Sequence, residues 1–196
     1  MIVRSDLLTA VDGRTRCGWV GDDDEYRRYH DEEWGRPLHG DRALFEKLSL
    51  EAFQSGLSWI TILRRRPGFR DAFDGFAIDV VCRYSEVDIA RLLGDDRIIR
   101  NRAKIVATIG NARILNAWLE HEPGGLDALI WAHCPHRAPR PNTLAEVPGI
   151  TPESTALARA LKGRGLHFVG PTTAYALMQS AGIVDDHLTG CWRAAP

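Results

Sequence analysis

The stretch Leu50-Glu51-Ala52-Phe53-Gln54-Ser55-Gly56-Leu57-Ser58-Trp59-Ile60 joins two helical patterns and brings a carboxylate and an indole to the corner between them. Upstream, apolar residues recur at three- and four-residue steps, which predicts an amphipathic helix with Asp41 as its N-cap. Gly56 can end that helix in a left-handed conformation, and the next helix is expected to end before Pro67. Glu51 lies beside the apolar stripe, where it could reach solvent or be kept dry. This stretch alone leaves both readings open.

Composition limits the class of protein. A chain of 196 residues fits one domain with a substantial core. Its 25 basic and 26 acidic residues give a formal net charge of -1, so a nucleic acid would have to be held by a local patch. The sequence has no long apolar run and no secretory segment, so we expect a cytoplasmic protein without membrane contact. Its four cysteines are widely spread, which disfavours a disulfide framework.

Helical spacing continues along most of the chain. Ser85-Glu86-Val87-Asp88 has the form of a capping box, and the apolar positions between residues 98 and 118 predict a long scaffold helix. Thr151 followed by Pro152 predicts another helix start. Alternating β-type clusters are short and rare. The sequence therefore predicts an all-α protein, with one helical domain over residues 15–196 and an arm of uncertain order over residues 1–14.

Two cysteines and two histidines near the ends of the chain have the chemistry of a closed zinc site. His187 and Cys191 lie four residues apart, and Cys17 and His30 can supply the other two ligands. Four protein ligands leave no position for water, so such a metal would be structural and would clip the chain ends together. The spacing is a weak signal by itself. Two inert cysteines and two ordinary histidines are the alternative.

The segment Phe168-Val169-Gly170-Pro171-Thr172-Thr173-Ala174-Tyr175-Ala176-Leu177-Met178 predicts a turn at Gly170 that leads into a helix. The first amides of a helix have no partner within it, so phosphate is a natural ligand there. With the preceding helix and its terminal Lys162 and Arg164, the segment resembles a helix-hairpin-helix, which grips the DNA backbone without reading sequence. An ordinary corner between packed helices is the alternative.

A second basic cluster consists of Arg64, Arg65 and Arg66, which stand at the expected end of the helix that begins at Trp59. Arginines at a helix C-terminus complement the helix dipole. They could equally form a rim that faces phosphate. The sequence favours neither the helix-dipole role nor the phosphate-facing rim.

Four aromatic side chains and Glu51 have the composition of a pocket for a flat base. Trp19, Tyr26, Tyr29 and Trp59 can sandwich a flat ring, and a desolvated carboxylate can accept its hydrogen bonds. A cationic base would suit such a pocket best. For Tyr26 and Tyr29, which share one helical face, an aromatic core stripe is the alternative.

These motifs together resemble those of the 3-methyladenine DNA glycosylase I family. The resemblance runs from about residue 15 to the end, and it is carried by Arg16-Cys17-Gly18-Trp19, Tyr29-His30-Asp31-Glu32-Glu33-Trp34-Gly35, Leu50-Glu51 through Gln54 to Gly56-Leu57-Ser58-Trp59-Ile60, Phe168-Val169-Gly170-Pro171-Thr172 and Asp186-His187. It implies the helix-hairpin-helix glycosylase fold, with a zinc site joining the N- and C-terminal segments. It also implies a monomer that acts on double-stranded DNA containing 3-methyladenine.

The resemblance assigns a role to each candidate residue. Glu51 would be the catalytic residue and, with Tyr29, would hydrogen-bond the lesion base between walls formed by Trp19, Tyr26 and Trp59. By the resemblance Gly56 and Leu57 would fill the gap in the duplex. The helix-hairpin-helix pattern adds further expected DNA contacts, which are Lys162, Arg164, Gly170 and Thr172. The zinc ligands would be Cys17, His30, His187 and Cys191.

The sequence departs from the family pattern at Val184-Asp185-Asp186-His187, where members usually read Val-Asn-Asp-His. Asp185 could add a second carboxylate near the sugar; alternatively it orients His30 or His187 or faces water. Thr172 stands where strand-cleaving relatives carry a lysine, so a monofunctional hydrolase is expected. A non-catalytic zinc-stapled module that binds damaged nucleic acid and a zinc hydrolase are the competing hypotheses.

Overall fold

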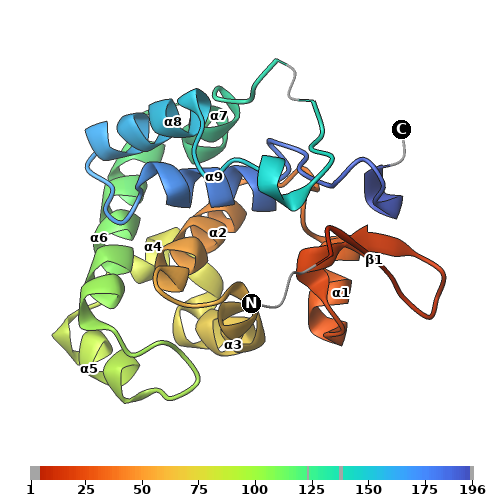
Figure 1. The fold of residues 1–196 in the computed structure, drawn as a ribbon. Coiled ribbons are helices and arrows are strands. Elements are labelled where there is room, and N and C mark those ends of the chain that lie inside the picture. The colour runs from red at the N-terminus through yellow and green to blue at the C-terminus, as the bar shows by residue number, and fades with distance from the viewer. Residues whose placement is uncertain (1–4, 123, 137–138, 195–196) are drawn as a thin grey trace.

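The central helix of the molecule is buried on almost all sides. The computed structural model describes residues 5–122, 124–136 and 139–194, so residues 1–4 of the predicted arm lie outside it. All residues from 47 to 53 in this helix are buried, although the sequence predicted one apolar face. The helix is α2 (Asp41–Gln54), and it packs against α3 (Trp59–Ala72), α6 (Arg102–Leu119), α7 (Gly125–Trp131) and α9 (Pro171–Ser180) (Figure 1).

The described chain is mostly helical, as the sequence predicted. Two short strands, β1 (Leu7–Thr9) and β2 (Thr15–Cys17), pair antiparallel with Leu7 opposite Cys17. Short 3-10 turns cover Gly18–Val20, Asp74–Phe76, Leu144–Glu146 and Trp192–Ala194. The remaining helices are α1 (Asp24–Glu32), α4 (Ile78–Val81), α5 (Glu86–Gly94) and α8 (Pro152–Gly163). In the described ranges no helix is both long and apolar enough to cross a membrane.

The two ends of the described chain meet on one side of the molecule. The β1–β2 hairpin, α1 and the segment after α9 lie together at the right of Figure 1, and β2 contacts the last 3-10 turn. This end has a small apolar cluster of its own, centred on Cys17, Leu188 and Cys191, separate from the main helical core. The fold thus brings together cysteines that are 174 positions apart in sequence.

Several helix starts follow the predicted capping chemistry. Ser85 Oγ accepts from Val87 N at 3.3 Å, and Asp88 accepts from Ser85 N at 2.9 Å, which completes the capping box. Thr151 Oγ1 accepts from Ser154 N at 3.1 Å at the start of α8. The long helix predicted from residue 98 begins later, at Arg102, where the Asn101 side chain caps it.

The helix α3 does not end before Pro67, as the sequence predicted, but continues to Ala72. Phe69 and Ala72 are almost fully buried, so the apolar face of the helix extends beyond the proline. Their burial outweighs the backbone hydrogen bond that proline removes. Gly68 is needed here for close packing, because a Cβ atom would lie 2.7 Å from Arg97 Cβ.

Asp41 is not the N-cap of α2, contrary to the sequence prediction. The helix begins at Asp41 itself, after Gly40 at φ +93°. Asp41 Oδ1 instead accepts a hydrogen bond of 2.9 Å from Asp127 N in the first turn of α7. This carboxylate therefore ties the start of α7 to the central helix, a contact that local sequence cannot reveal.

Candidate active site and metal centre

A cavity of about 330 Å³ opens between α1, α2, α3 and α9. Its lining includes all five residues that the sequence predicted for a base pocket: Trp19, Tyr26, Tyr29, Glu51 and Trp59. Gln179, Ser180 and Asp186 complete the far wall, and sequence reasoning had not selected any of them for this site. The pocket is within the size range of small-ligand sites in proteins.

The aromatic walls of the pocket are held at fixed angles. The ring centres of Tyr29 and Trp59 lie 5.5 Å apart at 47°, and those of Trp19 and Tyr26 lie 5.4 Å apart at 85°. The backbone amide of Ile60 donates to Tyr26 Oη at 2.9 Å, which ties α1 to the start of α3. Tilted and edge-on pairs are favourable for aromatic rings, so the walls are stable before any ligand enters.

Two side chains that line the pocket, those of Tyr29 and Trp59, carry hydrogen-bond donors. Burial, with Glu51 nearby, raises the pKa of Tyr29 well above its ordinary value, so its hydroxyl stays protonated and can donate. The indole Nε1 of Trp59 is buried, and among the described residues it has no hydrogen-bond acceptor. Of the two, the Tyr29 hydroxyl is the donor suited to a ligand acceptor in the pocket, whereas the Trp59 Nε1 atom has almost no accessible surface.

Glu51 is the one glutamate that lines this pocket within the described chain, and only 5% of its surface is exposed. Burial raises its pKa from 4.5 to about 7, against the opposing effects of Lys47 and a hydrogen bond with Ser180. An ionised carboxylate in such a place attracts a cationic ring more strongly than a neutral one, because burial strengthens its interaction with charge.

The same burial predicts that Glu51 lowers the stability of the folded chain at neutral pH. The carboxyl has a pKa of 4.5 in its ordinary state and about 7 when folded, so ionising it costs stability above pH 7, up to about 3 kcal/mol. The cost shrinks as the pH falls from 7 to 4.5 and is absent below that range. We therefore expect Glu51→Gln to raise Tm by roughly 5–10 °C at pH 8.

Thermal unfolding of both proteins between pH 4 and pH 8 measures this difference. The exposed Glu32→Gln is the matched control and should leave Tm unchanged across the range. A gain for E51Q that is equally large at pH 4 and pH 8 would show that the ionised carboxylate is not its cause.

The turn between α2 and α3 projects beside the pocket. Gly56 has a φ of +83°, as predicted for a helix end, and 41% of the Leu57 surface is exposed. Lys104 from α6 holds this turn, because its Nζ donates to Phe53 O at 2.9 Å and to Ser55 O at 2.8 Å. The exposed leucine therefore stands on a fixed backbone.

A second cluster joins the two chain ends next to the pocket. The ligand atoms of Cys17, His30, His187 and Cys191 all lie within 4.8 Å of one another, and all four residues are buried. Cys191 Sγ lies 3.4 Å from His30 Nε2 and 3.7 Å from His187 Nδ1. A tetrahedral zinc ion with bonds of about 2.0–2.3 Å separates its ligands by roughly 3.3–3.8 Å, so the cluster fits a metal ion of that kind.

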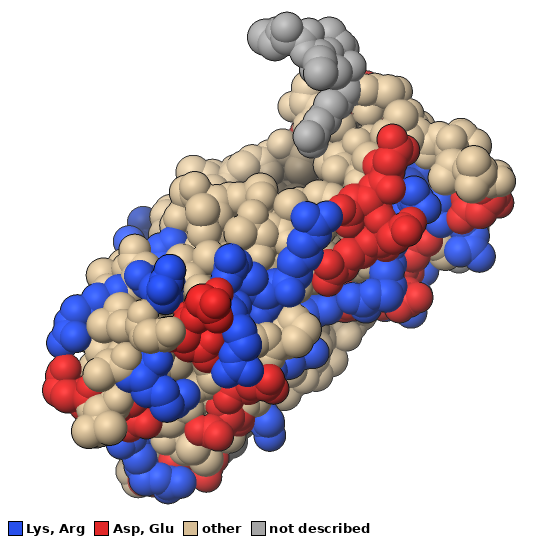
Figure 2. Space-filling model, turned by 90° about the horizontal axis from the view of Figure 1, so that it is seen from below, with Lys and Arg blue, Asp and Glu red and all other residues tan. Residues whose placement is uncertain are grey.

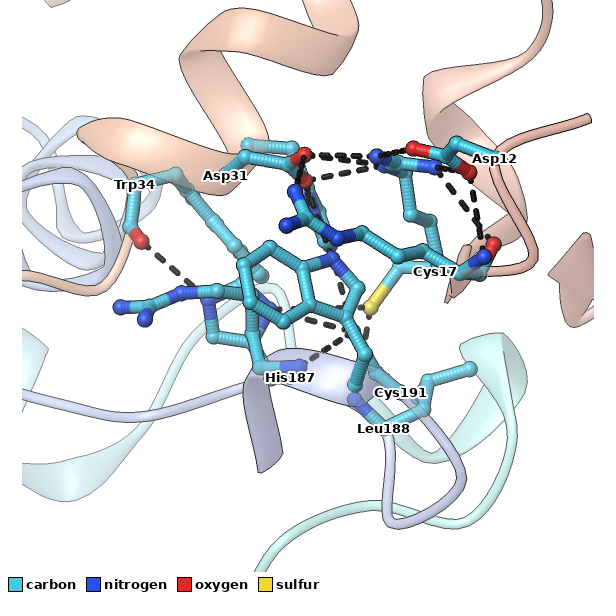
Figure 3. Close-up of polar contacts among 12 residues, drawn as sticks. Asp12, Cys17, Asp31, Trp34, His187, Leu188 and Cys191 are labelled. Atoms are coloured by element: carbon cyan, nitrogen blue, oxygen red, sulfur yellow. Dashed lines mark hydrogen bonds and ion pairs between the residues drawn. The ribbon is translucent and has the colours of Figure 1, made fainter. Parts of the chain in front are cut away.

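A second set of residues orients the two histidines. His30 Nδ1 lies 2.8 Å from Asp31 Oδ1, and Asp31 also accepts from Arg16 Nη2 at 2.7 Å and from Trp192 Nε1 at 3.1 Å. His187 Nε2 lies 3.2 Å from the carbonyl oxygen of Trp34 (Figure 3). Hydrogen-bond partners of this kind fix the tautomer and the orientation of a histidine ring that binds a metal ion. Asp31 directly follows His30 in the sequence, and this position could have identified it as a partner of the histidine, but it was not selected.

Asp185 does not line the pocket in the described structure. It forms an ion pair with Arg140, and its Oδ1 accepts from the backbone amide of His187 at 3.2 Å. It orients neither histidine ring. The neighbouring Asp186 lines the pocket instead, where it accepts from Tyr175 Oη at 2.6 Å and Gln179 Nε2 at 2.7 Å.

The predicted basic residues have acidic partners over much of the surface. Arg64 pairs with Asp23, and Arg66 forms two hydrogen bonds with Glu33. These arginines lie in the middle of α3, so the helix-dipole explanation for them is wrong. Figure 2 shows positive and negative side chains interspersed on this face of the molecule. The face drawn in Figure 2 therefore does not present a continuous basic rim that could bind phosphate groups.

The predicted DNA-contacting residues of the last third lie around the turn between α8 and α9. Lys162, Arg164 and Thr172 are exposed, and Gly170 is the N-cap of α9 without a side-chain cap. Arg164 pairs with Glu122, and its guanidinium carbon lies 4.4 Å from the centre of a Trp118 ring. The open amides at the start of α9 remain available to an anion.

A helical body and a ring-walled pocket with two buried carboxylates, Glu51 and Asp186, define a site suited to a flat base. The model of the methyladenine glycosylase family matches residues 19–194. The chain belongs to this family.

Known proteins agree with this assignment. The chain is 45% identical to DNA-3-methyladenine glycosylase 1 of Escherichia coli (strain K12), over 90% of this chain and 95% of that protein. It resembles a crystal structure of 3-methyladenine DNA glycosylase I at a TM-score of 0.87 and 42% identity, covering 90% and 98% of the two chains. A Staphylococcus aureus 3-methyladenine DNA glycosylase I, described for its recognition of 3-methyladenine, gives a TM-score of 0.86 at 30% identity, covering 92% and 97%.

Proposed function

We propose that this protein excises 3-methyladenine from alkylated double-stranded DNA by hydrolysing the N-glycosidic bond. The observation that carries the proposal is the buried Glu51 in a pocket that the rings of Tyr29 and Trp59 also line. The relatives that share its fold and 30–45% of its sequence are named for this lesion. A base reaches such a pocket only after extrusion from the duplex, which costs a few kcal/mol of stacking.

The chemistry follows from the charge of the lesion. Methylation at ring nitrogen 3 leaves adenine positively charged, so its glycosidic bond is weak and the base departs neutral without an acid. Glu51 favours the charged base over ordinary adenine, because of the two bases only the cation attracts the buried carboxylate. The same carboxylate can stabilise the positive charge that develops on the sugar or orient the attacking water. The rings of Tyr29 and Trp59 supply stacking, and the Tyr29 hydroxyl supplies a hydrogen-bond donor.

The cluster of Cys17, His30, His187 and Cys191 is proposed to hold a structural zinc ion. Two thiolates and two imidazoles are a common zinc set, and four protein ligands leave no position for a reactive water. The metal would join the β1–β2 hairpin and α1 to the segment after α9, next to the pocket wall. The reaction itself is assigned to the pocket residues.

DNA contact is assigned to the turn between α2 and α3 and to the turn between α8 and α9. The exposed Leu57, next to Gly56, is suited to fill the space that the extruded base leaves. We propose that α8 and α9 act as a helix-hairpin-helix, with phosphate at the N-terminus of α9 and with contacts from Lys162, Arg164, Gly170 and Thr172. We expect a cytoplasmic monomer.

Strand cleavage is not expected. A bifunctional glycosylase needs an amine in the pocket to form a Schiff base with the sugar. The described residues that line the pocket include no lysine, and Thr172 stands near the hairpin where strand-cleaving relatives carry one. We therefore propose a monofunctional hydrolase that leaves an abasic site.

A base-release assay on methylated duplex DNA tests the proposal. Chromatography of the released bases should show 3-methyladenine, with no release of adenine. Unmethylated DNA of the same sequence is the control, and 3-methylguanine in the same digest defines the breadth of the pocket. Binding to methylated DNA without any base release would replace the proposal with a non-catalytic binding module.

A further inference from the structure

Lys47 is a buried lysine behind the pocket, with no part in the reaction described above. It lies four residues before Glu51 on α2, so the two side chains leave the same side of the helix. Only 8% of its surface is exposed. A buried ammonium group is costly unless other groups compensate its charge. The groups around Lys47 therefore indicate which charge it compensates.

Two pocket aromatics and Glu51 are among the groups around Lys47. Its Nζ lies 5.1 Å from the centre of the Tyr29 ring and 5.7 Å from the centre of a Trp59 ring. The faces of aromatic rings attract cations, so both contacts favour the charged form of the lysine. Burial lowers the pKa of Lys47, and among carboxylates Glu51 opposes this shift most strongly, ahead of Glu33. The ammonium and the carboxylate thus compensate each other inside the protein.

Lys47 is absent from the lining of the base pocket. It lines a separate cavity of about 240 Å³, and the hydroxyl-bearing Ser180 borders both this cavity and the base pocket. Glu51 lines the base pocket, together with Tyr29 and Trp59. Lys47 can therefore act on a bound base only through the residues between them, which makes it a positioning residue.

The other charged groups around this pair are already engaged. Arg66 from α3 donates two hydrogen bonds to Glu33 after α1, and Arg70 from α3 pairs with Glu46 on α2. On the C-terminal side, Asp186 accepts hydrogen bonds from Tyr175 and Gln179. Lys47 is consequently the charge that acts most directly on Glu51.

We propose that Lys47 is the internal counter-ion of Glu51, keeping this carboxylate ionised in the empty pocket and setting the lowest pH at which the pocket accepts a cationic base. The inference rests on the proposed function, since it concerns the group that receives the charged lesion. Burial alone would drive Glu51 towards its protonated form, which has no charge to offer a cation. Lys47 counteracts the effect of burial on the pKa of Glu51. It lies outside the lining of the base pocket, so it leaves space for the base.

The test compares Lys47→Met, which keeps the length of the side chain without its charge, with Lys47→Arg, which keeps the charge. The ionisation of Glu51 is followed directly by NMR of ¹³C-labelled glutamate carboxyl groups, with the Glu51 signal identified by its loss in E51Q. In K47M the midpoint should rise by about 1 pH unit relative to the wild type, because an opposite charge at short range lowers a carboxyl pKa by about that much or more. In K47R it should stay near the wild-type value.

The acidic limb of kcat/KM for base release should move by the same amount in the same direction. Lys104→Met is the matched control, since it removes another buried lysine that bonds backbone carbonyls rather than Glu51; its midpoint should not move, whatever its rate. An unshifted Glu51 midpoint in K47M overturns the inference, even if E51Q is inactive. An E51Q protein that excises the lesion at the wild-type rate refutes instead the proposed role of Glu51, and the NMR midpoint still decides on Lys47.

Discussion

Replacing Glu51 with Gln is expected to lower kcat/KM for release of 3-methyladenine by roughly 10²–10³-fold at pH 8. The amide keeps the size of the side chain and can still accept a hydrogen bond, but it carries no charge to stabilise the cationic base or the developing charge on the sugar. Its burial at 5% exposure excludes bulk water from taking over that role. Single-turnover release from methylated duplex DNA measures the loss.

The control for this experiment separates chemistry from binding and folding. Fluorescence anisotropy on unmodified DNA should give the same affinity for E51Q and the wild type, because Glu51 lies inside the pocket rather than on the DNA-facing turns. The exposed E32Q should keep its activity. If E51Q retained more than a tenth of the wild-type rate, charge compensation at Glu51 would not be the source of catalysis.

Removing one ligand of the metal cluster is expected to cost several kcal/mol of folding free energy. The cluster joins segments that a two-stranded hairpin, a small apolar cluster and the polar contacts of Asp31 also hold, so a metal bound there would add stability at this end. Cys191→Ser should lower Tm by roughly 10–20 °C. It should also reduce the zinc content, measured by mass spectrometry, from one ion per chain to a small fraction.

Cys82→Ser provides the matched control, because this half-buried thiol lies outside the cluster and bonds only a nearby carbonyl, Asp79 O. Its zinc content and Tm should stay close to those of the wild type. A C191S protein that is free of zinc and as stable as the wild type would show that the four residues pack together without any need for metal.

Five residues of the pocket lining were selected from the sequence because they belong to short motifs of distinctive composition, whereas Gln179, Ser180 and Asp186 were not. A glutamate beside an apolar stripe, followed by Gly56 and Trp59, predicts a helical corner from local rules alone. The four candidate metal ligands could not be placed together by local rules, because Cys17 and Cys191 come from opposite ends of the sequence. Only the fold could bring their ligand atoms within 4.8 Å.

The errors in prediction came from long-range packing. Pro67 signals the end of a helix locally, but the burial of Phe69 carries α3 onward. Asp41 has the chemistry of an N-cap and does act near a helix start, although the helix in question is α7 rather than its own. In both cases the deciding partner is remote in sequence.

Lys47 shows the same limit within the site. A lysine on a helix that appears amphipathic is normally placed on the solvent face, so periodicity gave no reason to select it. Its role follows only once α1 and α3 cover that side of α2 and bring Tyr29 and Trp59 over its ammonium group. Sequence motifs identified the groups that face a ligand and missed the group behind them.

The most direct test of the central claim compares two duplexes that differ only in the charge of one base. One carries 3-methyladenine and the other a neutral isostere with carbon in place of ring nitrogen 3, both on a 2′-fluoro sugar that slows cleavage. Selection by the buried carboxylate predicts at least about tenfold tighter binding of the charged duplex by the wild type, or about 1.4 kcal/mol. The two affinities should become nearly equal in E51Q. Equal affinities in the wild type, or a preference that survives in E51Q, would contradict the account.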